Sequence, residues 1–338
     1  MSQSWITEVA TNEEKTNSSA VLQPISEYDL KVRSLFHSLP FASNFPLFLH
    51  TLFVVMLLAG CTTENKMKID RSQLIANLEH EMFTNPSWLR IHAAEGLLDN
   101  GESGNIAGLF QSEAGTATPP YRIGVWRVLA RSTTGDERNC YVERIREAMC
   151  DSQAIDRISA AESLGKINAV NRADRDFILN WLKTADDAAA PFPRWLLVLS
   201  SNPAERENDE AGLANLLSSS DPVARLRVAF ALGRLKDLSA TSVAKVRQQL
   251  IVEPTDSIAR VYLITALLLH VKDSAEIAGL EKQLVPYLNG KANEQLEVGI
   301  VTGLRGRSEG VELLKPLLNS PEPDARIGAA NGMLRLIK

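Results

Sequence analysis

A motif that recurs from about residue 71 to residue 338 constrains the fold of this chain more than any other feature. Its clearest copies read RIHAAEGLL from Arg90, RISAAESLG from Arg157, RLRVAFALG from Arg225 and RIGAANGML from Arg326. Weaker copies begin at positions 122, 194, 260 and 297, the last of them without the arginine. Self-similarity at a spacing of thirty-odd residues is the signature of a repeat array.

Each repeat is expected to hold two helices. A turn containing Pro, Asp or Asn precedes each copy of the motif, and such residues are favoured at helix N-caps and in first turns. A second stretch with apolar periodicity separates consecutive copies, for example over residues 243–251, 277–288 and 311–318. Aromatic residues make up only 6% of the chain, while Leu and Ala are abundant, which favours helices over strands. The sequence therefore predicts an all-α chain of about eight two-helix repeats.

The order of Asp or Pro turn, Arg-Ile, Ala-Ala and Leu-Gly resembles HEAT repeats, particularly the short bacterial type, over residues 71–338. This resemblance implies a right-handed α-solenoid whose arginine helices line the concave face. It also implies that each arginine bonds to an aspartate of the preceding turn. Asp151 has a suitable spacing before Arg157, whereas Asp221 and Asp324 lie closer to their arginines. HEAT-like arrays serve many functions, so the resemblance alone implies no chemistry.

The chain stops inside the last copy of the motif, so its C-terminal flank is expected to be poorly covered. Leu334, Leu336 and Ile337 are then candidates for contact with a partner or a second copy of the chain. The alternative is ordinary packing of these side chains onto the preceding repeat.

A second motif lies earlier, where Leu58, Ala59, Gly60 and Cys61 follow an apolar run. Residues 45–60 carry no formal charge, and they are too few for a membrane-spanning helix, which needs about 20. Such a length suits the apolar region of a signal peptide. The alternative, a buried core helix, is disfavoured because the polar residues 62–66 follow at once.

This second motif resembles the lipobox of bacterial lipoproteins. The resemblance implies that residues 1–60 are removed and that Cys61 carries acyl chains. Residues 61–70 would then tether the repeat domain, residues 71–338, to the membrane. Thr62 in place of Asp resembles an outer-membrane signal, with the protein facing the periplasm or the cell surface. Signal peptides lack a polar leader such as residues 1–27, so we expect translation to start downstream of Met1. The alternative is that these residues are a genuine disordered extension.

Charge and cysteine content exclude other classes of protein. The net charge is −5, and removing the five acids and three bases before Cys61 leaves 36 acids and 33 bases. A near-neutral chain without a basic run argues against nucleic acid as a partner. Cys140 and Cys150 lie on one expected helix about 15 Å apart, too far for a disulfide, and are expected to be buried free thiols.

No motif for catalysis, cofactor binding or metal binding is present in the sequence. A nucleophile elbow, a phosphate-binding glycine loop and a dinucleotide fingerprint are all missing. His80, Glu81, His92 and Glu95 could share a helix pair, but they form no metal-ligand motif, so surface and capping roles are favoured. Glu162 recurs at the position of Glu95 and is expected to be solvated. Bacterial HEAT-like proteins include bilin lyases, but neither cysteine has a lyase-like context. We therefore expect no catalytic residue, cofactor or metal.

The strongest candidate for a recognition surface combines aromatic and basic side chains, which are typical of binding hot spots. Its members are Trp88, Arg90, His92, Tyr121, Arg122, Trp126, Arg127, Arg194 and Trp195. The alternative is that Trp126 and Trp195 fill the core between helices, because both lie within the apolar pattern.

Two functions follow from these observations. The first is a lipid-anchored scaffold of the cell envelope that binds a protein partner through its concave face. The second is an accessory protein for the breakdown of polysaccharide or anionic sugar, with the Trp, Tyr and Arg cluster as its binding site.

Overall fold

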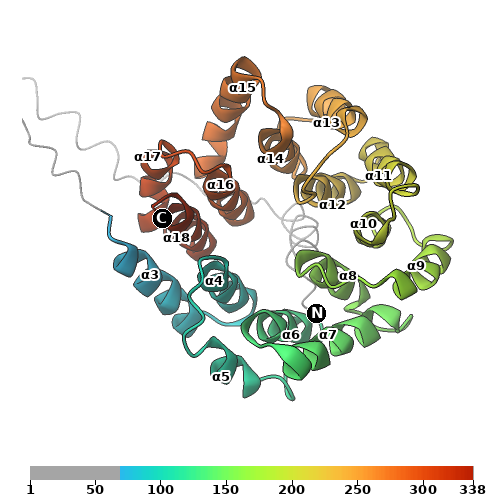
Figure 1. Ribbon diagram of the computed structural model, residues 1–338. Helices are drawn as coiled ribbons and strands as arrows, with labels where there is room; N and C mark the ends of the chain where they lie inside the picture. Colours follow the sequence, from blue (N-terminus) through green and yellow to red (C-terminus); the bar gives the residue numbers. More distant parts are fainter. Residues whose placement is uncertain (1–68, 338) are drawn as a thin grey trace, which may run out of the picture. The chain divides into compact units, whose positions relative to one another are not determined.

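A computed structural model describes residues 69–337 (Figure 1). The expected signal segment, the lipidation site Cys61 and most of the expected tether lie outside the described residues. Within them the chain is all-helical, with sixteen α-helices and no strand, packed in sequence order. The expected all-α array is therefore confirmed. In the part of the chain that the structure describes, no helix is both long enough and apolar enough to cross a membrane.

The helices form eight consecutive pairs, each with an outer and an inner helix (Figure 1). The outer helices are α3 (Arg71–Thr84), α5 (Ile106–Gln111), α7 (Gly135–Cys150), α9 (Arg175–Leu182), α11 (Arg206–Ala214), α13 (Ala240–Val252), α15 (Ser274–Leu284) and α17 (Gly310–Leu314). The inner helices are α4 (Ser87–Asp99), α6 (Tyr121–Ser132), α8 (Arg157–Lys166), α10 (Pro191–Ser200), α12 (Pro222–Gly233), α14 (Arg260–His270), α16 (Ala292–Arg305) and α18 (Pro323–Leu336). The inner helices are those that carry the recurrent motif.

Polar caps and prolines fix where several helices begin. Asp221 accepts a hydrogen bond from the Val223 amide, with Pro222 in the first turn of α12. Asp70, Ser239 and Asp273 cap α3, α13 and α15 in the same way. Each side chain satisfies an amide that the first helical turn leaves without a partner. The turns that interrupt the sequence pattern therefore also start the helices.

The inner helices are buried on nearly every side and pack through small residues. Ala93, Ala160 and Ala329 have no exposed surface. The closest approach joins α16 to α18, where a Cβ added to Gly299 would lie 2.2 Å from the carbonyl carbon of Gly328. Only glycine permits backbones to approach this closely.

The helical array of residues 70–337 closes on itself, because α18 packs against both α3 and α4 (Figure 1). Arg326 Nε lies 2.5 Å from Glu81 Oε1, and His92 Nδ1 lies 2.8 Å from Asp324 Oδ1. Leu334 is fully buried. The expectation of a poorly covered C-terminal flank is therefore wrong: the first pair of helices covers the last.

Four of the recurrent arginines, Arg90, Arg122, Arg225 and Arg326, bind acids of the following repeat rather than aspartates of the preceding turn. Arg122 and Arg225 make bidentate ion pairs with Asp156 and Glu253, 34 and 28 residues downstream. The bond from Arg326 to Glu81 is the same contact made around the closure of the ring. The expected partner Asp151 instead accepts a hydrogen bond from the Gln153 amide.

The other expected aspartates are also used elsewhere. Asp221 caps α12, and Asp324 pairs with His92. Arg157 stacks on the Trp181 ring, with its guanidinium carbon 3.8 Å from the ring centroid. The preceding turn still contributes through its backbone, because Arg225 donates to the carbonyls of Ser219 and Ser220.

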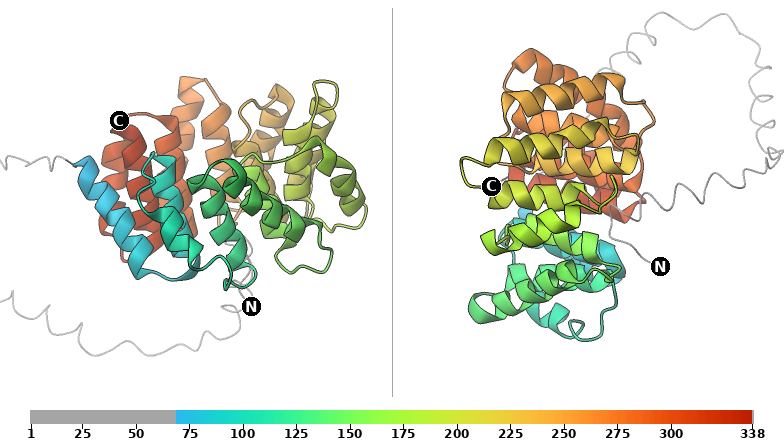
Figure 2. Two further views of the ribbon diagram at one scale, coloured as in Figure 1. Left: turned by 60° about the horizontal axis from the view of Figure 1, so that its bottom comes forward. Right: turned by 90° about the vertical axis from the view of Figure 1, so that its right-hand side faces the viewer.

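Short connections make each outer helix antiparallel to the inner helix that follows it (Figure 2). All inner helices therefore start at one edge of the ring and end at the other. The edge at which they end is also the edge at which α3 begins, at Arg71.

Candidate functional site

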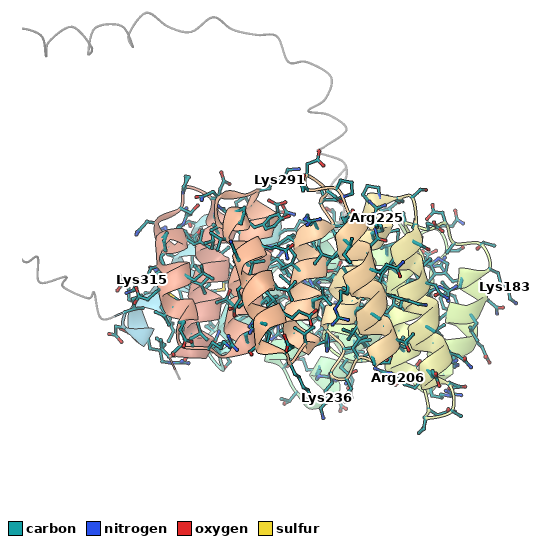
Figure 3. All side chains as sticks on the ribbon, turned by 90° about the horizontal axis from the view of Figure 1, so that it is seen from above. Lys183, Arg206, Arg225, Lys236, Lys291 and Lys315 are labelled. Atoms are coloured by element: carbon teal, nitrogen blue, oxygen red, sulfur yellow. The ribbon has the colours of Figure 1, made fainter. Side chains whose placement is uncertain are left out.

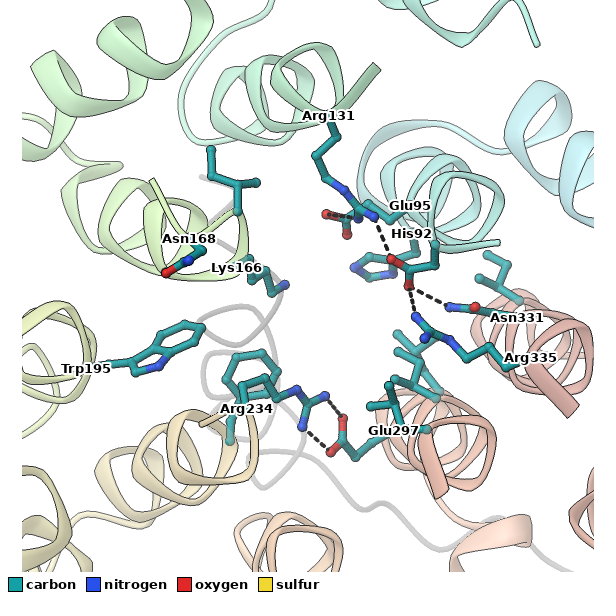
Figure 4. A pocket seen from close by; sticks show the side chains of 18 of the residues that line it. His92, Glu95, Arg131, Lys166, Asn168, Trp195, Arg234, Glu297, Asn331 and Arg335 are labelled. Carbon is teal, nitrogen blue, oxygen red and sulfur yellow. Dashed lines mark hydrogen bonds and ion pairs between the residues drawn. The ribbon is translucent and has the colours of Figure 1, made fainter. Parts of the chain in front are cut away.

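The inner helices enclose a central cavity of about 600 Å³ towards the edge at which they end (Figure 4). The cavity is lined by charged, aromatic and aliphatic side chains from seven of the eight inner helices and the segments that follow α8 and α12. They are His92, Glu95, Asp99, Arg131, Gly165, Lys166, Ile167, Asn168, Trp195, Leu199, Phe230, Arg234, Lys236, Leu296, Glu297, Ile300, Leu304, Ile327, Asn331 and Arg335. No other feature of the described residues gathers so many repeats at one place.

Ion pairs hold one side of the cavity together. Glu95 accepts two hydrogen bonds from Arg127, with Nε 2.6 Å from Oε1. Asp99 lies 2.6 Å from Arg131 Nη2 and 2.8 Å from Arg335 Nη2. Asp99 is in the last turn of α4, where the helix dipole disfavours a negative charge. The positive charges of Arg131 and Arg335 offset this unfavourable interaction of Asp99 with the helix dipole.

The electrostatics of Glu95 follow from these neighbours. Burial alone would raise the pKa of Glu95, but the positive charges of Arg127, Lys166 and Arg131 hold it well below its usual value. A carboxylate with a lowered pKa is a poor general base at neutral pH. Glu95 therefore acts as a fixed negative charge.

A second ion pair closes the opposite wall. The guanidinium of Arg234 makes two bonds of 2.8 Å to Glu297, which joins α12 to α16 across α14. Thr265 of α14 donates to the same carboxylate at 3.0 Å. Burial alone would lower the pKa of Arg234, but the negative charge of Glu297 outweighs this effect, so the pKa lies above its usual value. This arginine stays charged.

Aromatic rings form the wall between these ion pairs. Trp195 and Phe230 meet edge to face, with centroids 6.1 Å apart. Arg234 lies over the Phe230 ring at 4.2 Å, and Lys166 Nζ lies 5.4 Å from the same centroid. Gly165 makes room for the indole, because a Cβ there would come within 2.5 Å of the Trp195 ring. Only 1% of Trp195 is exposed, so its faces are covered.

The structure divides the expected recognition surface. Only His92 and Trp195 line the cavity. A separate cluster lies between α4, the segment before α6 and α6 itself, and we call it the α4–α6 cluster. Its members are Trp88, Arg90, Tyr121, Arg122 and Trp126.

Internal contacts occupy most polar groups of the α4–α6 cluster, although Trp88 Nε1 and Arg90 Nε are buried without a hydrogen-bond partner among the described residues. Arg90 and Tyr121 both bind Glu113, at 2.7 and 2.8 Å. Trp126 Nε1 donates to the Ala114 carbonyl at 3.2 Å, and Arg122 lies over its ring at 5.1 Å. Trp126 is only half-buried, whereas Trp195 is buried as the alternative interpretation expects.

The two remaining expected residues lie apart from the α4–α6 cluster. Arg127 lies between the α4–α6 cluster and the cavity. Its guanidinium binds Glu95 and donates to Ser163 Oγ. Arg194 extends towards Gly212 of α11.

Most of the charged residues around the cavity were missed by reasoning from the sequence. They occupy one position of the repeat, nine residues after the first residue of the motif. They are Asp99, Arg131, Lys166, Arg234 and Arg335. This recurrence was visible in the sequence. Helix length explains it, because nine residues from the motif start reach the last turn of α4, α6, α8 and α18 and the residue directly after α12.

The expected metal-ligand candidates have other partners or are not brought together. Glu81 binds Arg326, His92 binds Asp324 and Glu95 binds Arg127. Among residues 69–337, no group of three or more His, Cys, Asp or Glu side chains is placed to hold a metal ion. Glu162 is buried beside Lys166 rather than solvated, at 2.8 Å. Cys140 and Cys150 are free, and both are exposed rather than buried.

Comparison of the sequence with known proteins assigns it to no family. No family model matches the chain, and no curated protein matches it.

Proposed function

We propose that this protein is a binding protein that holds a narrow ligand in its central cavity and is tethered to the bacterial cell envelope through lipid on Cys61. The closure of the ring carries the first part of this proposal. An open solenoid offers a concave face to a folded domain, whereas a closed one surrounds a central cavity. A volume of about 600 Å³ falls within the range of small-ligand pockets. A single extended segment of an envelope protein also fits this description.

Binding fits the chemistry of the cavity better than catalysis. The three lining carboxylates, Glu95, Asp99 and Glu297, are each held by at least one arginine. Ion pairs of this kind orient a ligand, and they leave none of these three carboxylates free to act as a general base or nucleophile. The polysaccharide function has less support, because Trp195 has no open face for a sugar to stack on and the α4–α6 cluster is occupied by internal contacts.

A substitution that fills the cavity tests the proposal. Leu304 lines the cavity with 43% of its surface exposed, and Leu179 on α9 is 41% exposed on the outside of the ring. We expect Leu304→Trp to displace the ligand and Leu179→Trp to leave it bound, because only the first indole occupies the cavity. Native mass spectrometry of protein purified from its own envelope would detect the ligand as an added mass.

Two outcomes of this measurement count against the proposal. Equal retention of the added mass by both variants would place the ligand elsewhere, and no added mass on the unaltered protein would remove its basis. The same spectra report the state of Cys61. An unmodified cysteine behind an intact N-terminal segment would contradict the lipid tether without bearing on the cavity.

A further inference from the structure

The cavity mouth gathers positive charge at one edge of the ring. Figure 3 shows Lys291 and Arg225 at the edge where inner helices start, and Lys236 at the opposite edge. Five cations line the cavity, from Arg131, Lys166, Arg234, Lys236 and Arg335, against three carboxylates. Cations in a last helical turn are favoured by the helix dipole, which explains part of this pattern. It does not explain Lys236, which follows the end of α12.

The arginines are committed to the cavity walls, whereas the lysines are not equally fixed. Arg131 and Arg335 share Asp99, and Arg234 is paired with Glu297. Lys236 is exposed, and its ammonium makes no ion pair or hydrogen bond with the described residues. Lys166 bonds only to Glu162 of its own helix, four residues earlier. Since Arg127 already neutralises Glu95 and Glu162 neutralises Lys166, two positive charges remain in surplus at the mouth, one on Lys236 and one on the arginine pair that shares Asp99.

Asn168 adds a neutral donor to the lining of the same cavity, two residues after Lys166 (Figure 4). Its backbone is left-handed, with φ 49°, because it ends α8: the Ala169 amide bonds back to the Leu164 carbonyl at 3.0 Å. Asparagine tolerates this conformation better than most residues. Its side-chain amide makes no hydrogen bond within the described residues, so it is available to a ligand.

Building on the proposed function, we propose that the mouth of the cavity binds a phosphate monoester, with Lys236 and Lys166 as charge partners and Asn168 as a hydrogen-bond donor. The two surplus charges match a dianion. Lysine ammonium groups bind phosphate as point charges, without the fixed planar geometry that arginine requires. The ester is carried either by a soluble metabolite or by a lipid headgroup, and the chemistry at the mouth is the same for both.

Calorimetric titration with glycerol 3-phosphate tests the soluble source, and sedimentation with vesicles containing phosphatidic acid tests the lipid source. Vesicles of phosphatidylcholine alone are the control. We expect Lys236→Glu to weaken binding about tenfold or more, because it replaces attraction by repulsion. Lys282→Glu, an equal charge change on the outer helix α15, should leave binding unchanged. Asn168→Asp keeps a residue that tolerates the left-handed backbone and should weaken binding as well.

Binding of either probe that depends on Lys236 supports the proposal and identifies the source. Equal binding by Lys236→Glu and Lys282→Glu, or no binding of either probe at millimolar phosphate, would overturn it. Circular dichroism melting of each variant confirms that the fold is retained. This test is independent of the test with Leu304→Trp. If Leu304→Trp loses the ligand but neither phosphate probe binds, the phosphate proposal is rejected and the proposed binding function stands.

Discussion

Glu95 is held in the cavity wall between Arg127 and Arg131, and this arrangement shows how the protein places charge in its interior. Arg127 is itself buried and donates also to Ser163 Oγ. Buried ion pairs are costly to form, but removing one partner is costlier because the other charge stays buried without compensation. The carboxylate is therefore a structural requirement of this wall, whatever ligand the cavity holds.

Replacing Glu95 by Gln should lower the free energy of unfolding by about 3 kcal/mol at pH 7, because Arg127 loses its counter-charge. Since the folded state holds the pKa of Glu95 below 4.5, its usual value, the ionised form stabilises the fold above that pH. The difference between the two proteins should therefore shrink as the pH falls below 4.5. Urea denaturation across this range measures it. Glu312→Gln, which breaks an exposed pair with Lys315, is the control and should cost less than about 1 kcal/mol.

A stability difference that does not change at low pH would contradict this account of Glu95. A difference that stays constant from pH 7 to pH 3 would mean that packing, and not charge, carries the effect of the substitution.

At the scale of helices, α16 and α18 are joined by glycines rather than by interlocking side chains. A Cβ added to Gly303 would lie 2.5 Å from the Gly332 Cα, and Gly299 meets Gly328 in the same way. Contacts with backbone cannot be relieved by a change of rotamer. The two helices would have to separate, which would also disturb the closure of the ring at α18.

Gly303→Ala should therefore destabilise the protein by about 2 kcal/mol or more, despite the higher helix propensity of alanine. Gly279→Ala on α15 is the matched control, because nothing lies within 4 Å of its added Cβ. That change should be neutral or stabilising by up to about 1 kcal/mol. Thermal and urea denaturation of the pair separate the two effects, and similar stabilities for both variants would argue against close packing of α16 on α18.

The sequence was sufficient to predict the helices but not the contacts between repeats. Periodicity and capping turns such as Asp221-Pro222 predicted the helix pairs, because both act within a few residues. The acids that bind the motif arginines could not be identified, since spacing does not show whether Arg225 turns back to its own repeat or forward to Glu253. The cavity was missed for a related reason. Its charged residues recur at one position of the motif, but only the curvature of the array brings them together.

At the scale of the whole helical region, closure follows from small rotations summed over the repeats. The sequence of one repeat does not determine this sum, so an open solenoid was the natural expectation. Closure removes both free ends of the array, which otherwise need capping repeats. It also makes the last repeat equivalent to an internal one, because Arg326 binds Glu81 as Arg225 binds Glu253.

This equivalence gives a direct test of closure. Glu81 and Glu253 are both buried carboxylates that receive an arginine from the preceding repeat around the ring. Glu81→Gln should therefore cost as much stability as Glu253→Gln, about 3 kcal/mol in each case. In an open array Glu81 would face solvent at a free end, and its substitution would cost less than about 1 kcal/mol. Urea denaturation of the two variants decides between these cases. A neutral Glu81→Gln beside a destabilised Glu253→Gln would show that the ring is open in solution, and the central cavity on which the proposed function depends would be lost with it.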